Sequence, residues 1–300
     1  MKLSLPFFRT RKENSRQEAG EHGLQVGRAT EHPPVIGAPP FQVGHAQSVG
    51  LVRSHNEDAV VALTASLAAA GIAPDFGLFL VADGMGGHQE GERASAIAAQ
   101  SVARVIGRHV FSDLMEDTLD AAETDEFERL MHIALTNCNT NVAAAVPSGG
   151  TTVTAALLVG GHAIVGHVGD SRAYLLESES ITQLTADHSL VQRLQDLGEI
   201  TAAQAENHPQ RNVLLRAVGQ GDGLQADVTT HAVQSGARLL LCSDGLWGSL
   251  EDERMREIIS KSADVQPACE RLVHAANQAG GPDNVTAILI QYDHNSNVQL

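Results

Sequence analysis

The sequence predicts an α+β fold in which antiparallel sheets are covered by helices. Short apolar runs typical of buried strands recur at 77–83, 151–159, 162–168, 172–176, 238–244 and 284–292. Gly160 and Gly161 join two of these runs, and a two-residue glycine connection is a hairpin signal. Between the runs, apolar residues recur at helical spacing. Hairpins beside long helices favour antiparallel sheets with helices packed outside them.

Three segments are predicted to be amphipathic helices. One runs through 94–106 and a second through 127–142, each with its apolar residues on a single face. The third, 267–279, has Pro267 near its start, where the fixed φ angle of proline suits the first helical turn. The stretch "RLQDLGEIT" (193–201) reads as a shorter helix that is broken at Gly198.

One ordered domain is predicted over 44–293. Residues 1–43 are charged and then rich in glycine and proline, which indicates a disordered leader, and 294–300 form a short tail. The segment 187–232 is more polar than its surroundings and lacks an obvious buried strand. We interpret 187–232 as an inserted excursion, a flap or lid.

Composition narrows the classes of function. The net charge is −16, and the first twenty residues carry +3, which leaves −19 for the remainder. Such an acidic body would repel phosphates, so no nucleic-acid partner is expected, whereas cation binding is plausible. No run of about 18 apolar residues is present, so no transmembrane segment is predicted. Three cysteines without C-x-x-C spacing favour a reducing, cytoplasmic location.

Acidic residues recur at the ends of the apolar runs. Asp83, Asp170 and Asp244 end three of them, and Asp283 opens the last. Glu57 and Asp58 stand just before another apolar stretch. A single such acid usually caps a turn. Six at corresponding ends would repel one another and lose hydration, so they need positive charge. Hard oxygen ligands select Mg²⁺ or Mn²⁺.

Glycines accompany these acids. Gly84 follows Asp83, Gly245 follows Asp244, and Gly280 and Gly281 precede Asp283. A backbone that turns sharply beside a metal needs residues without a Cβ atom, so each acid has its own tight turn. The Gly84 carbonyl oxygen could then itself be a ligand.

The sequence resembles a known family, the metal-dependent serine/threonine protein phosphatases of the type 2C class (PPM family), in their bacterial stand-alone form. The resemblance covers roughly 45–292 and is carried by eight motifs in the expected order. They are "GLVRSHNEDAV" (50–60), "VADGMGGHQEGERAS" (81–95), "GGTTVTAALL" (149–158), "VGHVGDSRAYLL" (165–176), "LTADHSLVQRL" (184–194), "NVLLRAVG" (212–219), "LLLCSDGLWGSL" (239–250) and "GGPDNVTAILI" (280–290).

The resemblance implies a four-layer α-β-β-α sandwich, two antiparallel sheets flanked by helix pairs, with a Mn²⁺ or Mg²⁺ centre of two ions and a third, weaker site at one end. By similarity, Asp83 bridges both metals and the Gly84 carbonyl completes the first. Asp244 and Asp283 hold the second, and Asp170 joins Asp244 at the third site. Glu57 and Asp58 act through water. Arg53 grips the substrate phosphate, so Arg53 and Asp83 are the expected catalytic residues.

The implied activity is hydrolysis of phosphoserine and phosphothreonine in proteins by a metal-activated water. The expected partners are phosphorylated proteins and a cognate bacterial serine/threonine kinase, and the enzyme is expected to be a monomer. The proton donor to the leaving group stays open. Met85 stands where animal relatives place a histidine, which leaves His88 or, as the favoured donor, a water on the metal.

Two other functions fit the sequence less well. A catalytically inactive relative that serves as a binding module is opposed by the intact aspartates and Arg53. A nucleotide-handling enzyme is disfavoured because the chain has no P-loop motif. Cys242 lacks the arginine six residues later that cysteine phosphatases need, and we interpret it as packing within a strand. Trp247 is expected to anchor the core beside the site, and His188 to order the start of the excursion.

Overall fold

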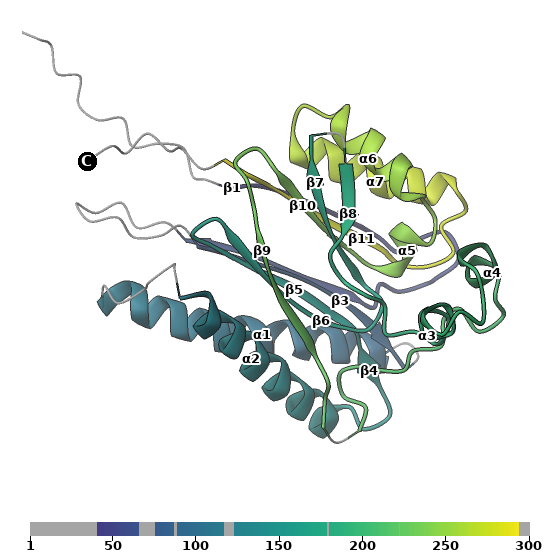
Figure 1. Cartoon of the computed structure of the whole chain (residues 1–300). Helices are drawn as coiled ribbons and strands as arrows, with labels where there is room; N and C mark the ends of the chain where they lie inside the picture. The colour runs from purple at the N-terminus through teal and green to yellow at the C-terminus, as the bar shows by residue number, and fades with distance from the viewer. Residues whose placement is uncertain are drawn as a thin grey trace, which may run out of the picture. The chain divides into compact units, whose positions relative to one another are not determined.

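Two antiparallel β-sheets lie face to face at the centre of the structure (Figure 1). The computed structural model describes residues 41–65, 76–86, 89–116, 123–178, 180–221 and 223–293, the side chains of 113–116 excepted. The first sheet has the order β1 (Phe41–Ser48), β11 (Val285–Tyr292), β10 (Arg238–Cys242), β7 (Arg172–Glu177) and β8 (Ser180–Gln183). The second has the order β2 (Asp58–Ala65), β3 (Phe76–Met85), β5 (Val153–Val159), β6 (His162–Val168) and β9 (Asp227–Ala232), with β4 (Gly150–Thr151) paired to β3.

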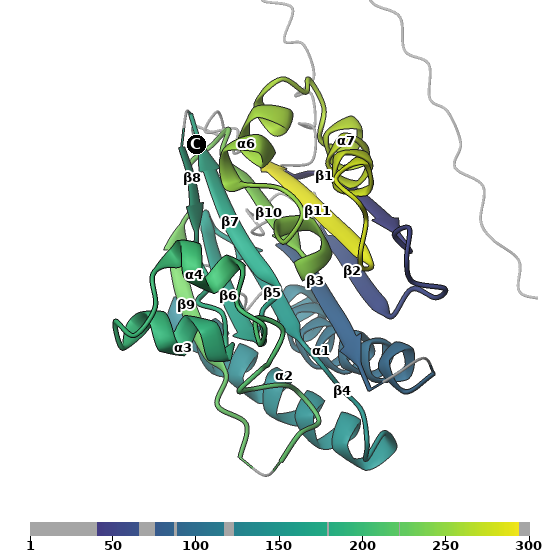
Figure 2. The same ribbon diagram turned by 90° about the vertical axis from the view of Figure 1, so that its right-hand side faces the viewer.

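Helices cover the outer face of each sheet. Figures 1 and 2 show α1 (Gln89–Glu116) and α2 (Thr124–Ala145) against the second sheet, and α6 (Asp252–Ser260) and α7 (Val265–Gln278) against the first. Three shorter helices, α3 (Leu190–Asp196), α4 (Ala202–Glu206) and α5 (Asp244–Trp247), belong to connecting segments. The predicted fold, a four-layer α-β-β-α sandwich, is confirmed.

Four layers require three apolar interfaces, and the central strands supply residues to two of them at once. In β3, Leu78 and Leu80 pack in the cluster beneath α1 and α2, whereas Phe79 and Val81 pack between the two sheets. This alternation follows from the two-residue period of a strand. Because both faces are covered, such strands read as continuous apolar runs, and for this reason they were visible in the sequence.

Most predicted elements lie where the sequence placed them. The run 162–168 coincides with β6, and Gly160 and Gly161 form the β5–β6 hairpin with φ angles of 56° and 80°. The run 151–159 is divided, because Thr152 stands between β4 and β5. The run 238–244 ends as a strand at Cys242, and Asp244 begins α5.

The sequence did not show β1, β8 or β9. β1 begins at Phe41, so residues 41–43, which were assigned to the leader, belong to a strand. The excursion over 187–232 ends in β9, which pairs with β6 at the edge of the second sheet. Residues 1–40 and 294–300 lie outside the described residues, so the leader and the tail stay predictions. None of the described helices is long and apolar enough to cross a membrane.

Candidate active site

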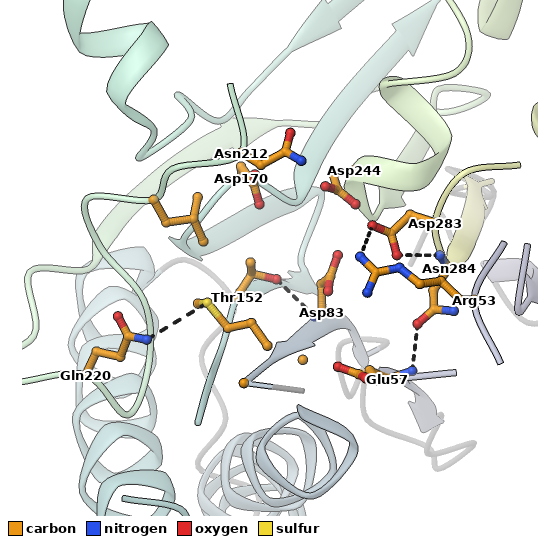
Figure 3. A pocket seen from close by; sticks show the side chains of 14 residues that line it. Arg53, Glu57, Asp83, Thr152, Asp170, Asn212, Gln220, Asp244, Asp283 and Asn284 are labelled. Atoms are coloured by element: carbon orange, nitrogen blue, oxygen red, sulfur yellow. Dashed lines mark hydrogen bonds and ion pairs between the residues drawn. The ribbon is translucent and has the colours of Figure 1, made fainter. Parts of the chain in front are cut away.

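The predicted acids meet at one end of the sandwich, around a cavity of about 290 Å³ (Figure 3). Of the predicted site residues, Arg53, Glu57, Asp83, Gly84, Asp170, Asp244 and Asp283 line this cavity. Asp58 does not line it. The remaining lining residues are Met85, Gly86, Thr152, Asn212, Leu214, Gln220 and Asn284. His88 lies outside the described residues.

Strand pairing brings the acids together from distant parts of the sequence. Asp58 at the start of β2 pairs directly with Asp83 near the end of β3. The end of β10 lies beside the start of β11, so Asp244 and Asp283 emerge at the same edge. Asp170 follows the end of β6 and enters the cavity from the turn that leads to β7.

The glycines next to the acids are required by close backbone approach. A Cβ atom added at Gly84 would collide with the carbonyl of Gly91 at the start of α1. One added at Gly245 would collide with the carbonyl of Asn284. These two glycines therefore let α1 and α5 approach the strand ends closely. The predicted tight turns at Gly84 and Gly245 are wrong, because Gly84 lies within β3 and Gly245 within α5, and close packing of backbone explains both glycines. Only Gly280 and Gly281, with φ angles of 125° and 48°, form the turn that was expected before Asp283.

Burial and mutual repulsion perturb the carboxyl groups strongly. Loss of hydration, with the neighbouring carboxylates of Asp58, Asp244 and Asp170, holds the pKa of Asp83 well above its usual range. Burial, and then the charge of Asp244, likewise raise the pKa of Asp170. For Asp244, burial and the charge of Asp283 raise the pKa to about 6. The cluster is therefore a concentrated negative site that a cation would stabilise.

Asp58 lies behind the cavity wall. Its Oδ2 atom accepts hydrogen bonds from Ser243 Oγ (2.9 Å) and Thr286 Oγ1 (2.6 Å). These bonds lower its pKa, but burial outweighs them and raises the pKa to about 7. Its Oδ1 atom is buried, as is Oδ1 of Asp244, and neither has a hydrogen-bond partner among the described residues. Buried carboxylate oxygens without a donor are the kind of acceptor that cations or ordered water satisfy.

Arg53 is the one cationic side chain among the described residues that line the cavity. Its Nη2 atom donates to Asp283 Oδ2 at 2.6 Å, and this bond raises the pKa of the guanidinium. About half of the Arg53 side chain, 51%, is exposed, so its planar fork is accessible from solvent. Arg53 thus lies at the mouth of an acidic cavity, where an incoming phosphate would otherwise be repelled.

Divalent cations fit the donor set. Among the described residues, no three His, Cys, Asp or Glu side chains already surround one point as a finished coordination sphere. In the structure Asp283 accepts a hydrogen bond from Arg53, and Asp58 accepts hydrogen bonds from Ser243 and Thr286. The lining nevertheless supplies several carboxylates and the Gly84 carbonyl around one small cavity, which is the ligand chemistry of Mg²⁺ and Mn²⁺.

Thr152 connects two of the acid-bearing segments, and this role was not predicted from the sequence. Its hydroxyl accepts a hydrogen bond from the Asp83 amide (3.0 Å) and lies 2.7 Å from the Ser171 hydroxyl. Its own amide donates to the Asp83 carbonyl at 2.9 Å. Thr152 therefore fixes the end of β3 relative to the turn that carries Asp170.

That turn is held from two further sides. Trp247 Nε1 donates to the Asp170 carbonyl at 2.9 Å, and the guanidinium of Arg172 lies 3.6 Å from the centre of the indole. His188 donates its amide to the Gly169 carbonyl (2.7 Å), and its Nδ1 atom accepts from the Gly169 amide (3.1 Å). Trp247 does lie beside the site, and His188 ties the start of the excursion to this turn. Cys242 is completely buried, and burial raises the pKa of its thiol.

Asn284 organises the loop that presents Arg53. Its amide nitrogen donates to the carbonyls of Val49 (2.9 Å) and His55 (2.8 Å), while its amide oxygen accepts from the Glu57 amide (2.8 Å). A buried asparagine with both donor hydrogens used is a strong constraint on the chain around it. The position directly after Asp283 was the only signal in the sequence.

Comparisons with known proteins agree with this site. The family model for Protein phosphatase 2C matches residues 54–289. Serine/threonine phosphatase stp of Listeria monocytogenes is 34% identical over 222 residues, which are 72% of this chain and 84% of the relative. The crystal structure of the Mycobacterium tuberculosis serine/threonine phosphatase PstP/Ppp matches with a TM-score of 0.71 and 34% identity, over 85% of this chain and 99% of that one.

A further solved structure bears on the metal. The catalytic domain of PstP in complex with two manganese ions matches with a TM-score of 0.69 and 32% identity, over 85% of this chain and 99% of that one. The expectations of a hydrolase and a protein phosphatase are thereby confirmed. The chain belongs to the protein phosphatase 2C family.

Proposed function

We propose that this protein removes phosphate from phosphoserine and phosphothreonine in other proteins and opposes a bacterial serine/threonine kinase. One observation carries the proposal: Asp83, Asp170, Asp244 and Asp283 line a single cavity with Arg53 at its mouth. The names of the relatives support the choice of serine and threonine as the targets. Nothing in the cavity favours the inactive binding module, since the acids and the arginine are all present.

In this proposal, the chain holds two Mn²⁺ or Mg²⁺ ions. Asp83 would be shared between them, with the Gly84 carbonyl on one side and Asp244 and Asp283 on the other. Asp170 would hold a third ion more loosely, and Glu57 and Asp58 would contribute through water. When bound, the cations supply charge that offsets the phosphoryl oxygens and the acidity that makes water a nucleophile at neutral pH.

Arg53 would bind the phosphate of the substrate. In the structure one donor of its guanidinium, Nη2, is bound to Asp283 Oδ2, so a phosphate that used Nη2 as well would displace this carboxylate. A phosphate offers the planar fork two acceptor oxygens in the same way as a carboxylate does, so the exchange preserves the hydrogen bonds of Arg53.

The leaving alkoxide needs a proton. Met85 lines the cavity and cannot supply one, and the described lining residues include no histidine. Asn212 and Gln220 are the neutral polar side chains on the flap side of the cavity, and they can orient a substrate or a water without charge transfer. We therefore favour water in the cavity as the proton donor.

The proposal is tested with matched phosphopeptides. Phosphate release from phosphoserine, phosphothreonine and phosphotyrosine versions of one peptide is measured with Mn²⁺, with Mg²⁺ and after addition of EDTA. We expect turnover of the first two peptides with either metal, little turnover of the third, and loss of activity with EDTA. Turnover that survives EDTA, or a preference for phosphotyrosine, would contradict the proposal.

A further inference from the structure

Exposed apolar side chains stand next in the sequence to two residues that line the cavity. Leu51 and Val52 are 70% and 72% exposed, the highest values among the large hydrophobic residues that the structure describes, and they directly precede Arg53. On the flap, Val213 and Leu215 are 41% and 54% exposed and flank Leu214, which lines the cavity. Single exposed apolar residues are ordinary, but their concentration beside a binding site indicates an interaction surface.

The loop that carries Leu51 and Val52 is held firmly. The Leu51 amide donates to the Gly281 carbonyl at 2.7 Å, and Asn284 binds the carbonyls on both sides of the loop, at Val49 and His55. Gly50 has a φ angle of 82°, and a Cβ atom there would collide with the Asp283 carbonyl. The two exposed side chains are therefore presented by a well-ordered backbone, so a ligand would find the surface already formed.

The position of this surface, beside Arg53, indicates that the substrate polypeptide would bind to it. When a phosphate on a protein reaches Arg53, the polypeptide continues in both directions from the phosphorylated residue, with Cα atoms about 3.8 Å apart. The residues that flank it are then held close to the loop that carries Arg53, and Leu51 and Val52 directly precede Arg53 in that loop. The substrate is thus the one macromolecule that catalysis itself brings to this surface.

We propose that Leu51 and Val52 bind an aliphatic side chain adjacent to the phosphorylated residue of the substrate. The inference rests on the proposed function and adds to it the class of preferred substrate: phosphopeptides with aliphatic flanks. The net charge of −16 also disfavours substrates with acidic flanks. Contact with even part of a leucine side chain corresponds to a preference of roughly tenfold.

The test compares three phosphothreonine peptides that differ only in the residues flanking the phosphorylated one: leucine, serine or aspartate. The value of kcat/KM is measured for each peptide with the metal-loaded full chain and with the double variant Leu51→Ser/Val52→Ser. We expect the wild type to prefer the leucine peptide to the serine peptide roughly tenfold. The double variant should reduce that ratio to near one, and the aspartate peptide should be the poorest substrate of both proteins.

Leu63→Ser is the matched control. Leu63 is also an exposed leucine, at 43%, but it lies in β2 five residues beyond Asp58, roughly 17 Å along the strand. This control should keep the wild-type preference. Each ratio is compared with the hydrolysis of p-nitrophenyl phosphate by the same preparation.

Three outcomes would overturn the inference. They are a wild type without preference, a preference that persists in the double variant, and an equal loss on all peptides and p-nitrophenyl phosphate, which would show general damage. Each of these leaves the proposed function standing as long as the wild type dephosphorylates the peptides. A wild type that hydrolyses p-nitrophenyl phosphate but none of the phosphopeptides would overturn both.

Discussion

Replacement of Trp247 by phenylalanine should weaken the hold on the turn that carries Asp170. The change removes one hydrogen bond, from the indole Nε1 atom to the Asp170 carbonyl at 2.9 Å, and keeps an aromatic ring beneath Arg172. Asp170 is only 7% exposed, so its carbonyl loses a partner in a largely buried place. An unsatisfied buried group costs about 1–3 kcal/mol, and partial exposure of Trp247 places this case near 1 kcal/mol.

A loss of about 1 kcal/mol corresponds to a fall in melting temperature of roughly 2–4 °C for a domain of this size. It also corresponds to about a fivefold change in any equilibrium that depends on the position of Asp170. We therefore expect Trp247→Phe to lower the melting temperature slightly and to lower kcat/KM for a phosphopeptide by about fivefold. Scanning calorimetry and steady-state kinetics at saturating Mn²⁺ measure the two effects.

A double-mutant cycle separates positioning from general destabilisation. If Trp247 acts on catalysis through Asp170, the effect of Trp247→Phe on kcat/KM should largely vanish in the Asp170→Asn background. Additive losses in kcat/KM would refute this role for the indole. Trp247 is the only tryptophan in the chain, so its fluorescence in the wild type should also change on titration with Mn²⁺.

Three further predictions follow from the charges of the site. Arg53→Ala should raise KM for phosphopeptides more than it lowers kcat, because the arginine would bind the phosphate about equally in the ground state and in the transition state. An unchanged KM with a collapsed kcat would argue against this role. Asp170→Asn should keep the tight Mn²⁺ sites seen by calorimetry while phosphoprotein turnover falls, and loss of tight binding would contradict the division of roles. Metal-free protein should lose stability as pH rises from about 4 to about 7. The pKa of Asp244 is raised from 3.8 to about 6 in the folded protein, and that of Asp58 from 3.8 to about 7. The folded state therefore binds these protons more tightly than the unfolded chain, and this advantage is lost as they dissociate. Urea unfolding across that pH range, with Mn²⁺ present as the comparison, checks the slope, and a stability that rises with pH would overturn the assignment.

The acids could be predicted because each ends or opens an apolar run, and a strand that is buried on both faces is visible as such a run. The residues that position them could not. Asn284 acts on Val49, 235 residues away in the sequence, and Trp247 acts on Asp170, 77 residues away. Contacts of this kind depend on how the two sheets pack, and no local period reports that packing.

The strands that were not predicted from the sequence, β1, β8 and β9, were missed for related physical reasons. β8 and β9 lie at sheet edges and alternate between exposed and partly buried residues, so they carry few apolar side chains. β1 also lies at an edge, and Gly44 within it reads as a breaker. The structure explains this glycine, because a Cβ atom there would collide with the backbone of Gln266 in α7.

The central claim is that the fold gathers carboxylates into a cation site organised around Asp83. Titration calorimetry with Mn²⁺ tests it most directly on three proteins: the wild type, Asp83→Asn, and Asp252→Asn as a matched change at an exposed aspartate at the start of α6. The wild type and Asp252→Asn should bind Mn²⁺ tightly, and Asp83→Asn should lose that binding, since its amide cannot offset the charge of two dications. Without metal, Asp83→Asn should be at least as stable as the wild type, because the change removes a buried charge from a repelling cluster. Tight Mn²⁺ binding by folded Asp83→Asn, equal to that of the wild type, would contradict the claim.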